Sequence, residues 1–243
     1  MTHSGAWRKR LGSWLLRGTR SFAIILRGFF GNRARSEHPR ILVVVEGRRD
    51  VEFLRRISAI LHREDPALPD LGELEQRLDL VFVPSGGDDS ATWAFRFAGL
   101  RLPEFHLFDR DVPPATEARR RTAAMVNWRP GCCAVVTSKR ALENYLNADA
   151  IFEASGIRIE VTDEADVAET VARQAYERRE RPLPWDQLPA RARKRHRDKA
   201  KKWLNTRAVE RMTPTRLAQR DPKGEVRTWM ATIASLAYQR TYH

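Results

Sequence analysis

The chain has 243 residues, of which 42% are hydrophobic and 31% are charged, so it holds enough apolar material for a packed core and is not disordered throughout. Its formal net charge of +13 does not restrict the fold, but it favours polyanionic partners, with nucleic acid first and an anionic membrane second. The length allows one large domain, or one domain with a smaller one appended.

The positive charge is concentrated in two blocks. Residues 1–40 hold nine Lys and Arg residues against one acid, Glu37, and residues 191–211 hold ten against Asp198 and Glu210. Each block is therefore +8, and the rest of the chain sums to 13 − 16 = −3. A mildly acidic body with two basic appendages is expected.

Residues 1–39 form the first predicted unit, a basic amphipathic segment with a linker. Aromatic and aliphatic residues recur there at helical spacing with Arg between them, but the apolar stretch 21–30 is too short to span a membrane and is interrupted by Arg27. We expect residues 1–36 to pack on the protein or on a partner, with membrane contact as the less favoured alternative. The two cysteines, Cys132 and Cys133, are adjacent and are expected to be small buried hydrophobes in a cytoplasmic protein.

Residues 40–150 alternate between strand and helix patterns. The run 41–45 is apolar at every position, which indicates a strand covered on both faces. Further strands are predicted at 80–83, 105–108 and 134–136, the last with Cys132 and Cys133 as a possible start, and helices at 50–61, 89–99, 115–127 and from 140 onward, with Asp50 as the first helix's N-cap. This alternation predicts an α/β fold with a parallel sheet of about four strands flanked by helices.

Residues 151–243 are predicted to be a mostly helical, basic C-terminal extension. A strand is possible at 157–161, and helices are expected at 164–179, 191–211 and 225–238. The block 191–211 is either a solvated helix face or a set of phosphate contacts, and its density of charge favours the contacts. The predicted nucleic-acid-binding residues are Arg191, Arg193, Lys194, Arg195, Arg197, Lys199, Lys201 and Lys202.

Polar residues follow each predicted strand at the sheet edge where ligands of parallel sheets bind. Glu46 and Asp50 follow the first strand, Asp109 and Asp111 the third, and Lys139 and Glu143 the fourth. Carboxylates brought together repel one another unless a cation neutralises them, and an all-oxygen set suits Mg²⁺ or Mn²⁺. Lys139 adds a positive charge for a phosphate or a leaving oxygen.

The motifs Val44–Asp50 and Leu107–Asp111 resemble the Toprim domain, a Rossmann-like fold found in topoisomerases, primases and certain nucleases. The segment Thr137–Leu146 is similar to the one that follows the last core strand in nucleases of the OLD family (overcoming lysogenization defect). The resemblance covers roughly residues 40–240. It implies a nuclease with two metal ions, in which Glu46, Asp109 and Asp111 hold one ion, Asp50 and Glu143 hold the other, and Glu46, Asp109 and Lys139 are catalytic.

The chain departs from the usual OLD protein in one respect. No Gly-x-x-x-x-Gly-Lys-Ser/Thr loop occurs, so the ATPase of that family is expected on a separate chain. The resemblance further implies a role in bacterial anti-phage defence. A non-catalytic nucleic-acid-binding or scaffold module that works with an ATPase is the alternative. DNA versus RNA as substrate stays open, as does the oligomeric state, a homo-oligomer included.

Overall fold

The structure is a computed structural model that describes residues 38–86, 90–179 and 183–238. The basic amphipathic helix predicted within residues 1–39 lies outside the described residues, apart from the last two positions of its linker. The same holds for residues 87–89, which follow the second strand.

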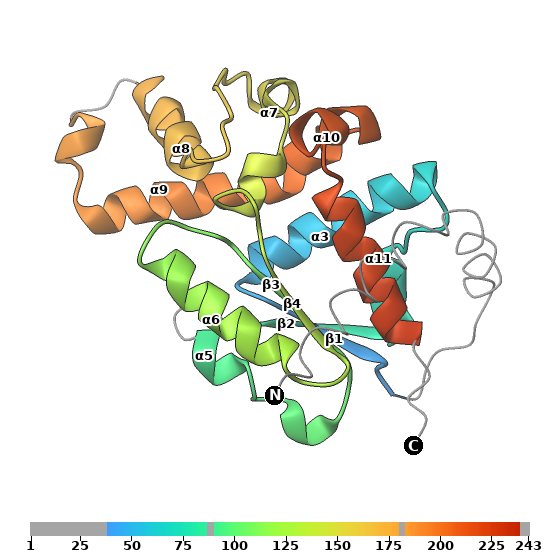
Figure 1. Cartoon of the computed structure of the whole chain (residues 1–243). Coiled ribbons are helices and arrows are strands. Elements are labelled where there is room, and N and C mark those ends of the chain that lie inside the picture. The colour runs from blue at the N-terminus through green and yellow to red at the C-terminus, as the bar shows by residue number, and fades with distance from the viewer. Residues whose placement is uncertain (1–37, 87–89, 180–182, 239–243) are drawn as a thin grey trace.

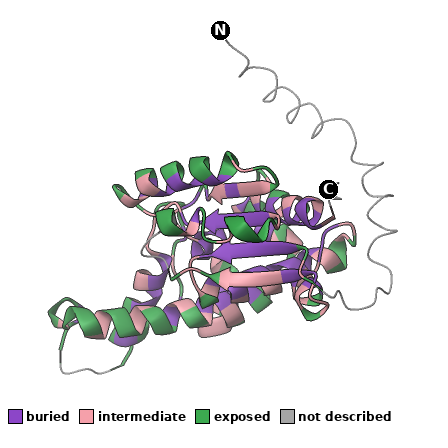
Figure 2. Cartoon of the chain, turned by 90° about the horizontal axis from the view of Figure 1, so that it is seen from below, coloured by how far each residue is buried: buried purple, intermediate pink, exposed green. Residues whose placement is uncertain are grey.

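Four parallel strands form the centre of the molecule (Figure 1). They are β1 (Ile41–Val45), β2 (Leu80–Pro84), β3 (Glu104–Phe108) and β4 (Cys132–Val136), in the order β2-β1-β3-β4. All three strand pairs are parallel, which confirms the predicted α/β fold. All five residues of β1 are buried, as the unbroken apolar run indicates for a strand covered on both faces. The other central strand, β3, is buried as well, whereas the edge strands β2 and β4 are mostly half-buried (Figure 2).

Each face of the sheet is covered by its own set of helices. The helices α3 (Arg48–Glu64), α4 (Leu71–Gln76) and α11 (Glu225–Tyr238) pack on one face, where Val43 and Phe105 enter the larger apolar core. The helices α5 (Ser90–Trp93) and α6 (Ala115–Asn127) cover the other face and share a smaller core with Phe108.

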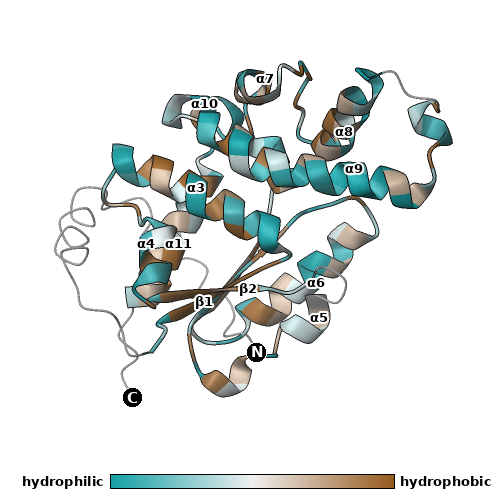
Figure 3. Ribbon diagram, turned by 180° about the vertical axis from the view of Figure 1, so that it is seen from behind, coloured by the Kyte–Doolittle hydropathy of each residue, from teal (hydrophilic) through white to brown (hydrophobic). Residues whose placement is uncertain are grey.

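The remaining helices stand beyond the carboxyl ends of the strands (Figures 1 and 3). They are α7 (Ala148–Ser155), α8 (Val167–Glu177), α9 (Ala190–Trp203) and α10 (Pro214–Arg220), with short 3-10 turns η2 (Leu142–Tyr145), η3 (Trp185–Gln187) and η5 (Val209–Arg211) and a π-helical turn η4 (Leu204–Ala208). A further 3-10 turn, η1 (Ala98–Leu100), comes shortly before β3. Among the helices described, none is both long and apolar enough to cross a bilayer.

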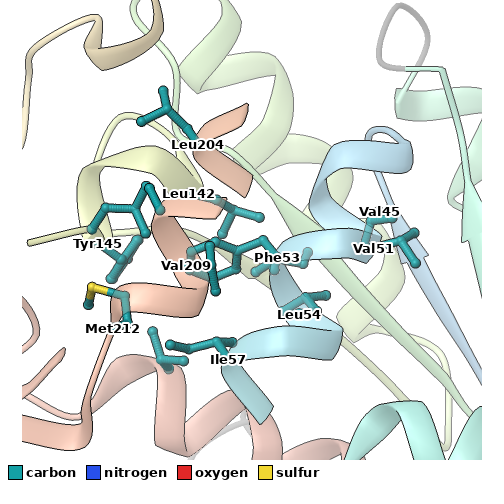
Figure 4. Close-up of a cluster of buried hydrophobic side chains, with 14 of the residues drawn as sticks. Val45, Val51, Phe53, Leu54, Ile57, Leu142, Tyr145, Leu204, Val209 and Met212 are labelled. Atoms are coloured by element: carbon teal, nitrogen blue, oxygen red, sulfur yellow. The ribbon is translucent and has the colours of Figure 1, made fainter. Parts of the chain in front are cut away.

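An apolar cluster fastens the end of α9 to the sheet domain (Figure 4). Leu204 and Val209, from the turns that continue α9, lie among Phe53 and Ile57 of α3 and Leu142 of η2. The cluster holds the last turn of α9 over the strand ends, although α9 and β1 are far apart in the sequence.

Four local predictions differ from the structure. The possible strand at 157–161 is irregular, because Ile157 and Val161 are buried against helices and pair with no strand among the described residues. The predicted helix at 89–99 is the short α5 followed by turns, and the helix predicted from 140 onward is the 3-10 turn η2 followed by α7. Asp50 is the third residue of α3 instead of its N-cap, which is Gly47.

Candidate active site

Glu46 and Asp109 lie side by side because β1 and β3 are neighbours in the sheet. Each residue follows directly after its strand, so both strands deliver a carboxylate to the same edge. The backbone N–H of Asp109 donates to Oε1 of Glu46 at 3.2 Å. Asp109 is buried, and its Oδ1 accepts from the backbone N–H of Leu142 at 3.2 Å, which ties η2 to the same edge.

Asp50 and Glu143 complete a buried inner group with Asp109. The side chain of Asp50 reaches back to cap α3, with Oδ2 accepting from the backbone N–H of Gly47 at 2.7 Å. Glu143 lies in η2 and is only 2% exposed. The turn after β4 thus adds a third acidic side chain to the region beyond β1 and β3.

Asp111 and Glu46 form an outer pair held by one arginine. The guanidinium of Arg119, a buried residue of α6, pairs with Glu46 through Nη1 and lies 2.7 Å from Oδ2 of Asp111 through Nη2. Asp111 has a φ of +56°, in the left-handed region that costs most residues about 1–2 kcal/mol and that aspartate tolerates better than bulkier residues. The outer carboxylates are therefore neutralised in part by a fixed cation.

Helix α9 and the π-turn after it bring two more groups to the inner carboxylates. Lys201 Nζ lies 3.9 Å from Oε1 of Glu143. The side chain of Asn205, in η4, donates from Nδ2 to the same oxygen at 2.8 Å. The sequence predicted Lys201 only as a nucleic-acid contact and predicted no role for Asn205 or Arg119, because a lysine or arginine within a charged helix looks the same whether it faces solvent or a site.

Burial and mutual repulsion raise the pKa of Glu46, Asp50 and Asp109. Burial, and then the charges of Asp50 and Asp111, raise the pKa of Glu46 to about 7, against the opposing effect of Arg119. Burial chiefly raises the pKa of Asp50 to about 6. The pKa of Asp109 is raised well above its ordinary range by burial and by its acidic neighbours, and Glu143 in turn raises the pKa of Lys201. Additional positive charge at this end of the sheet would therefore favour ionisation of these carboxyl groups.

Lys139 contacts Asp163 and not the carboxylates at the strand ends. Its ammonium group lies 2.5 Å from Oδ1 of Asp163 and 5.4 Å from the ring centre of Tyr145. The hydrogen bond from Lys139 lowers the pKa of Asp163. Lys139 is buried, and what the structure shows is a role in joining η2 to the segment before α8. The predicted catalytic role of Lys139 stays a prediction.

The predicted nucleic-acid-binding residues of α9 lie in four different environments. Arg191, Lys194, Arg195, Lys199 and Lys202 are exposed, and Arg193 is partly buried. Arg197 is tied to Asp166 at 3.0 Å and to Glu169 at 3.2 Å, whereas Lys201 faces the carboxylates. An exposed basic face therefore continues up to the acidic edge.

The donor chemistry suits a hard divalent cation. The side chains are oxygen donors that raise one another's pKa, and Oδ1 of Asn205 is a buried acceptor with no partner among the described residues. In the arrangement described, with Arg119 and Lys201 as the neutralising cations, no three acidic, histidine or cysteine side chains of the described chain form a group that could hold a metal ion. The residues thus fit a divalent ion by their chemistry. In this arrangement their oxygen atoms do not converge on one shared position.

The fold is similar to that of the C-terminal region of the OLD protein of Xanthomonas campestris pv. campestris. One solved structure of that region has 13% identity and a TM-score of 0.48, covering 86% of this chain and all (100%) of that chain. A second has 14% identity and a TM-score of 0.45, covering 84% of this chain and 97% of the other. No protein-family model matches the sequence, and no curated protein matches it.

Proposed function

We propose that this chain is a nuclease that hydrolyses phosphodiesters of DNA or RNA with Mg²⁺ or Mn²⁺. The observation that carries the proposal is the meeting of acidic side chains from three strand ends with Lys201, which comes from a basic helix. The acidic residues are Glu46, Asp50, Asp109, Asp111 and Glu143. A cluster that opposes its own ionisation is costly to keep, and a bound cation removes that cost.

The proposed division of labour follows the two groups of carboxylates. Asp50 and Glu143 would hold one ion and Glu46, Asp109 and Asp111 a second, with Glu46 and Asp109 catalytic. Bound there, the ions would polarise a phosphodiester and lower the pKa of a water molecule. Lys201 would bind a phosphate oxygen, since its ammonium faces this edge. The exposed residues of α9, Arg191 and Lys202 among them, would hold the nucleic-acid backbone.

The second candidate is a non-catalytic module that binds nucleic acid and works with a separate ATPase. One observation favours it: Arg119 already pairs with Glu46 and Asp111, and Lys201 already faces Glu143. A cluster neutralised by its own side chains has less need of metal. If this candidate is right, the affinity for nucleic acid will not change when divalent ions are removed or when the carboxylates are replaced.

Cleavage assays on the purified chain separate the two candidates. Single-stranded and double-stranded DNA and RNA would be incubated with Mg²⁺, with Mn²⁺ or with a chelator. We expect cleavage that needs the ion and that falls by about a hundredfold or more in Glu46→Ala and Asp109→Ala. Glu160→Ala, which removes an exposed carboxylate outside the site, is the matched control and should leave cleavage unchanged.

The result that would reject the nuclease is cleavage that is absent with every substrate and ion while the nucleic acid still binds. Cleavage that persists unchanged in Glu46→Ala and Asp109→Ala would reject the site. A role in anti-phage defence is a further part of the proposal, and its test is protection of cells against phage by the wild-type gene and not by Asp109→Ala.

A further inference from the structure

Asn205 is a fully buried amide with one half of its hydrogen-bonding capacity unused. Its Nδ2 donates to Oε1 of Glu143 at 2.8 Å. A carboxylate oxygen can only accept, so this bond determines which end of the amide is Nδ2 and leaves Oδ1 without a bond to Glu143. Oδ1 has no hydrogen-bond partner among the residues that the structure describes. Leaving a buried acceptor unsatisfied costs about 1–3 kcal/mol, which calls for a partner from outside the protein.

The surroundings of Asn205 show which kind of partner is missing. Lys201 precedes Asn205 by one helical turn, and its Nζ approaches the same oxygen of Glu143 to 3.9 Å. The charges of Asp50 and Asp109 act on Lys201 as well, so this end of α9 faces the inner carboxylates. A bound cation would stabilise the charged form of Asp50 and Asp109, whose pKa values are raised. An amide oxygen is itself a ligand of hard cations.

The backbone around Asn205 is also unusual. Leu204–Ala208 forms a π-helical turn at the point where α9 passes over the strand ends. Such turns are rare and occur often at functional sites. Leu204, Asn205 and Ala208 are all 0% exposed, so the turn is a packed part of the molecule and holds the Asn205 side chain in place.

We propose that Asn205 is a further ligand of the divalent cation held by Asp50 and Glu143, with Oδ1 as the donor atom. A neutral oxygen adds to the coordination shell without adding to the repulsion among the carboxylates. The bond from Nδ2 positions Glu143 for the same ion. The inference rests on the proposed function, because it takes a divalent cation at this edge as given.

Mn²⁺ binding to the full chain, measured by calorimetry and by the shift in melting temperature, tests the assignment without any assay of cleavage. Asn205→Leu keeps the size of the side chain and removes both polar atoms, so Mn²⁺ affinity should fall by about ten- to a hundredfold. Asn205→Asp keeps an oxygen and adds a charge. Its metal-free form should melt below the wild type, and the rise in melting temperature with Mn²⁺ should exceed that of the wild type.

If Asn205 only positions Glu143 and does not bind the ion, a different pattern is expected. Both variants lose the bond from Nδ2, so both would then lose Mn²⁺ affinity and neither would show an enlarged rise in melting temperature. That pattern, or an unchanged affinity in Asn205→Leu, would overturn the proposal. If Asn205→Leu does not fold, the smaller Asn205→Ser takes its place with the same expected loss of affinity.

Asn144→Asp is the matched control. Asn144 is a buried asparagine next to Glu143, but its oxygen accepts from Ala141 at 3.0 Å and its amide donates to Thr162 at 2.7 Å. The same substitution there should lower stability with no enlarged effect of Mn²⁺. If the wild type binds no Mn²⁺ at all, the proposed function falls together with this inference. If the wild type binds Mn²⁺ and cleaves, and only the Asn205 pattern fails, the proposed function stands.

Discussion

Lys139 and Lys201 each carry a positive charge close to the strand ends, but their ammonium groups face different partners. Lys201 faces Glu143, whereas Lys139 is bound to Asp163. We expect Lys201→Met to lower cleavage by about a hundredfold with a small change in melting temperature, since removing one preorganised charge near a phosphate costs about that much. Lys139→Met should chiefly lower the melting temperature. Single-turnover cleavage and thermal unfolding of both variants measure this.

Lys194→Met is the control for Lys201. It lies on α9 two turns earlier, is exposed, and pairs with Asp198 at 3.2 Å. Its loss should change cleavage by less than about threefold, the scale of one weak surface contact. The assignment fails if Lys139→Met stops cleavage in a stable protein while Lys201→Met does not.

The raised pKa of Glu46 makes the metal-free protein less stable as the pH rises. Folded Glu46 keeps its proton up to a pKa of about 7, whereas the ordinary value is 4.5. Between these values the unfolded chain has released a proton that the folded chain retains, so stability falls by about 1.4 kcal/mol for each pH unit. Glu46→Gln does not titrate, and by pH 8 it should gain about 2–3 kcal/mol on the wild type relative to pH 4.5. Urea unfolding in chelator at several pH values measures the difference, and a constant difference across the range would contradict it.

The strand-end carboxylates were predictable from the sequence because a parallel sheet brings the ends of neighbouring strands together whatever the rest of the chain does. Glu46 and Asp109 need only the order of β1 and β3 to meet. Arg119 and Asn205 were not predictable in the same way. Their contacts depend on how α6 and α9 pack over the edge, and no local pattern around either residue encodes that packing.

At the scale of elements, Leu204 links the fold to the site. It is 0% exposed and lies in the cluster of Figure 4 with Phe53 and Leu142. Leu204→Ala removes that packing and should cost about 2–5 kcal/mol of unfolding free energy. Because Asn205 and Lys201 stand next to this residue, Mn²⁺ affinity should fall as well. Leu183→Ala, an exposed leucine, should change neither. Urea unfolding and calorimetry measure both effects, and a loss of stability below about 1 kcal/mol would contradict the packing.

The helices that were predicted well are those with a strong periodic pattern and a clear boundary. The range of α6 agrees with the predicted 115–127, and that of α11 with the predicted 225–238. The segment 157–161 failed for the opposite reason. Its alternation of buried and exposed residues is that of a strand, but a strand also needs a neighbour, and this segment pairs with none of the four strands β2-β1-β3-β4.

At the scale of the whole molecule, acidic side chains gather at the strand ends and basic side chains on α9, and in the proposed function the first would carry the chemistry and the second the affinity for nucleic acid. Arg191, Arg195 and Lys202 recur at helical spacing on one exposed flank of α9, and Lys194 and Lys201 share the adjoining flank. Figure 3 shows α9 as largely hydrophilic along its length. In the proposed function a strand of nucleic acid would follow this face towards Lys201, which lies 3.9 Å from Glu143.

This division predicts how binding depends on salt. Phosphate contacts release counterions, and each contact steepens the plot of log affinity against log salt by about 0.9 for duplex and 0.7 for single strands. The triple variant Arg191→Glu, Arg195→Glu, Lys202→Glu should therefore flatten the slope by about 2–3 and weaken binding to all sequences alike. Arg63→Glu, Arg120→Glu, Arg121→Glu changes the net charge equally at exposed positions of α3 and α6. The slope of log affinity against log salt would be measured by fluorescence anisotropy titrations. If affinity depends on the net charge of +13 and not on the exposed face of α9, the two triple variants will show the same slope. That result would reject α9 as the nucleic-acid-binding surface.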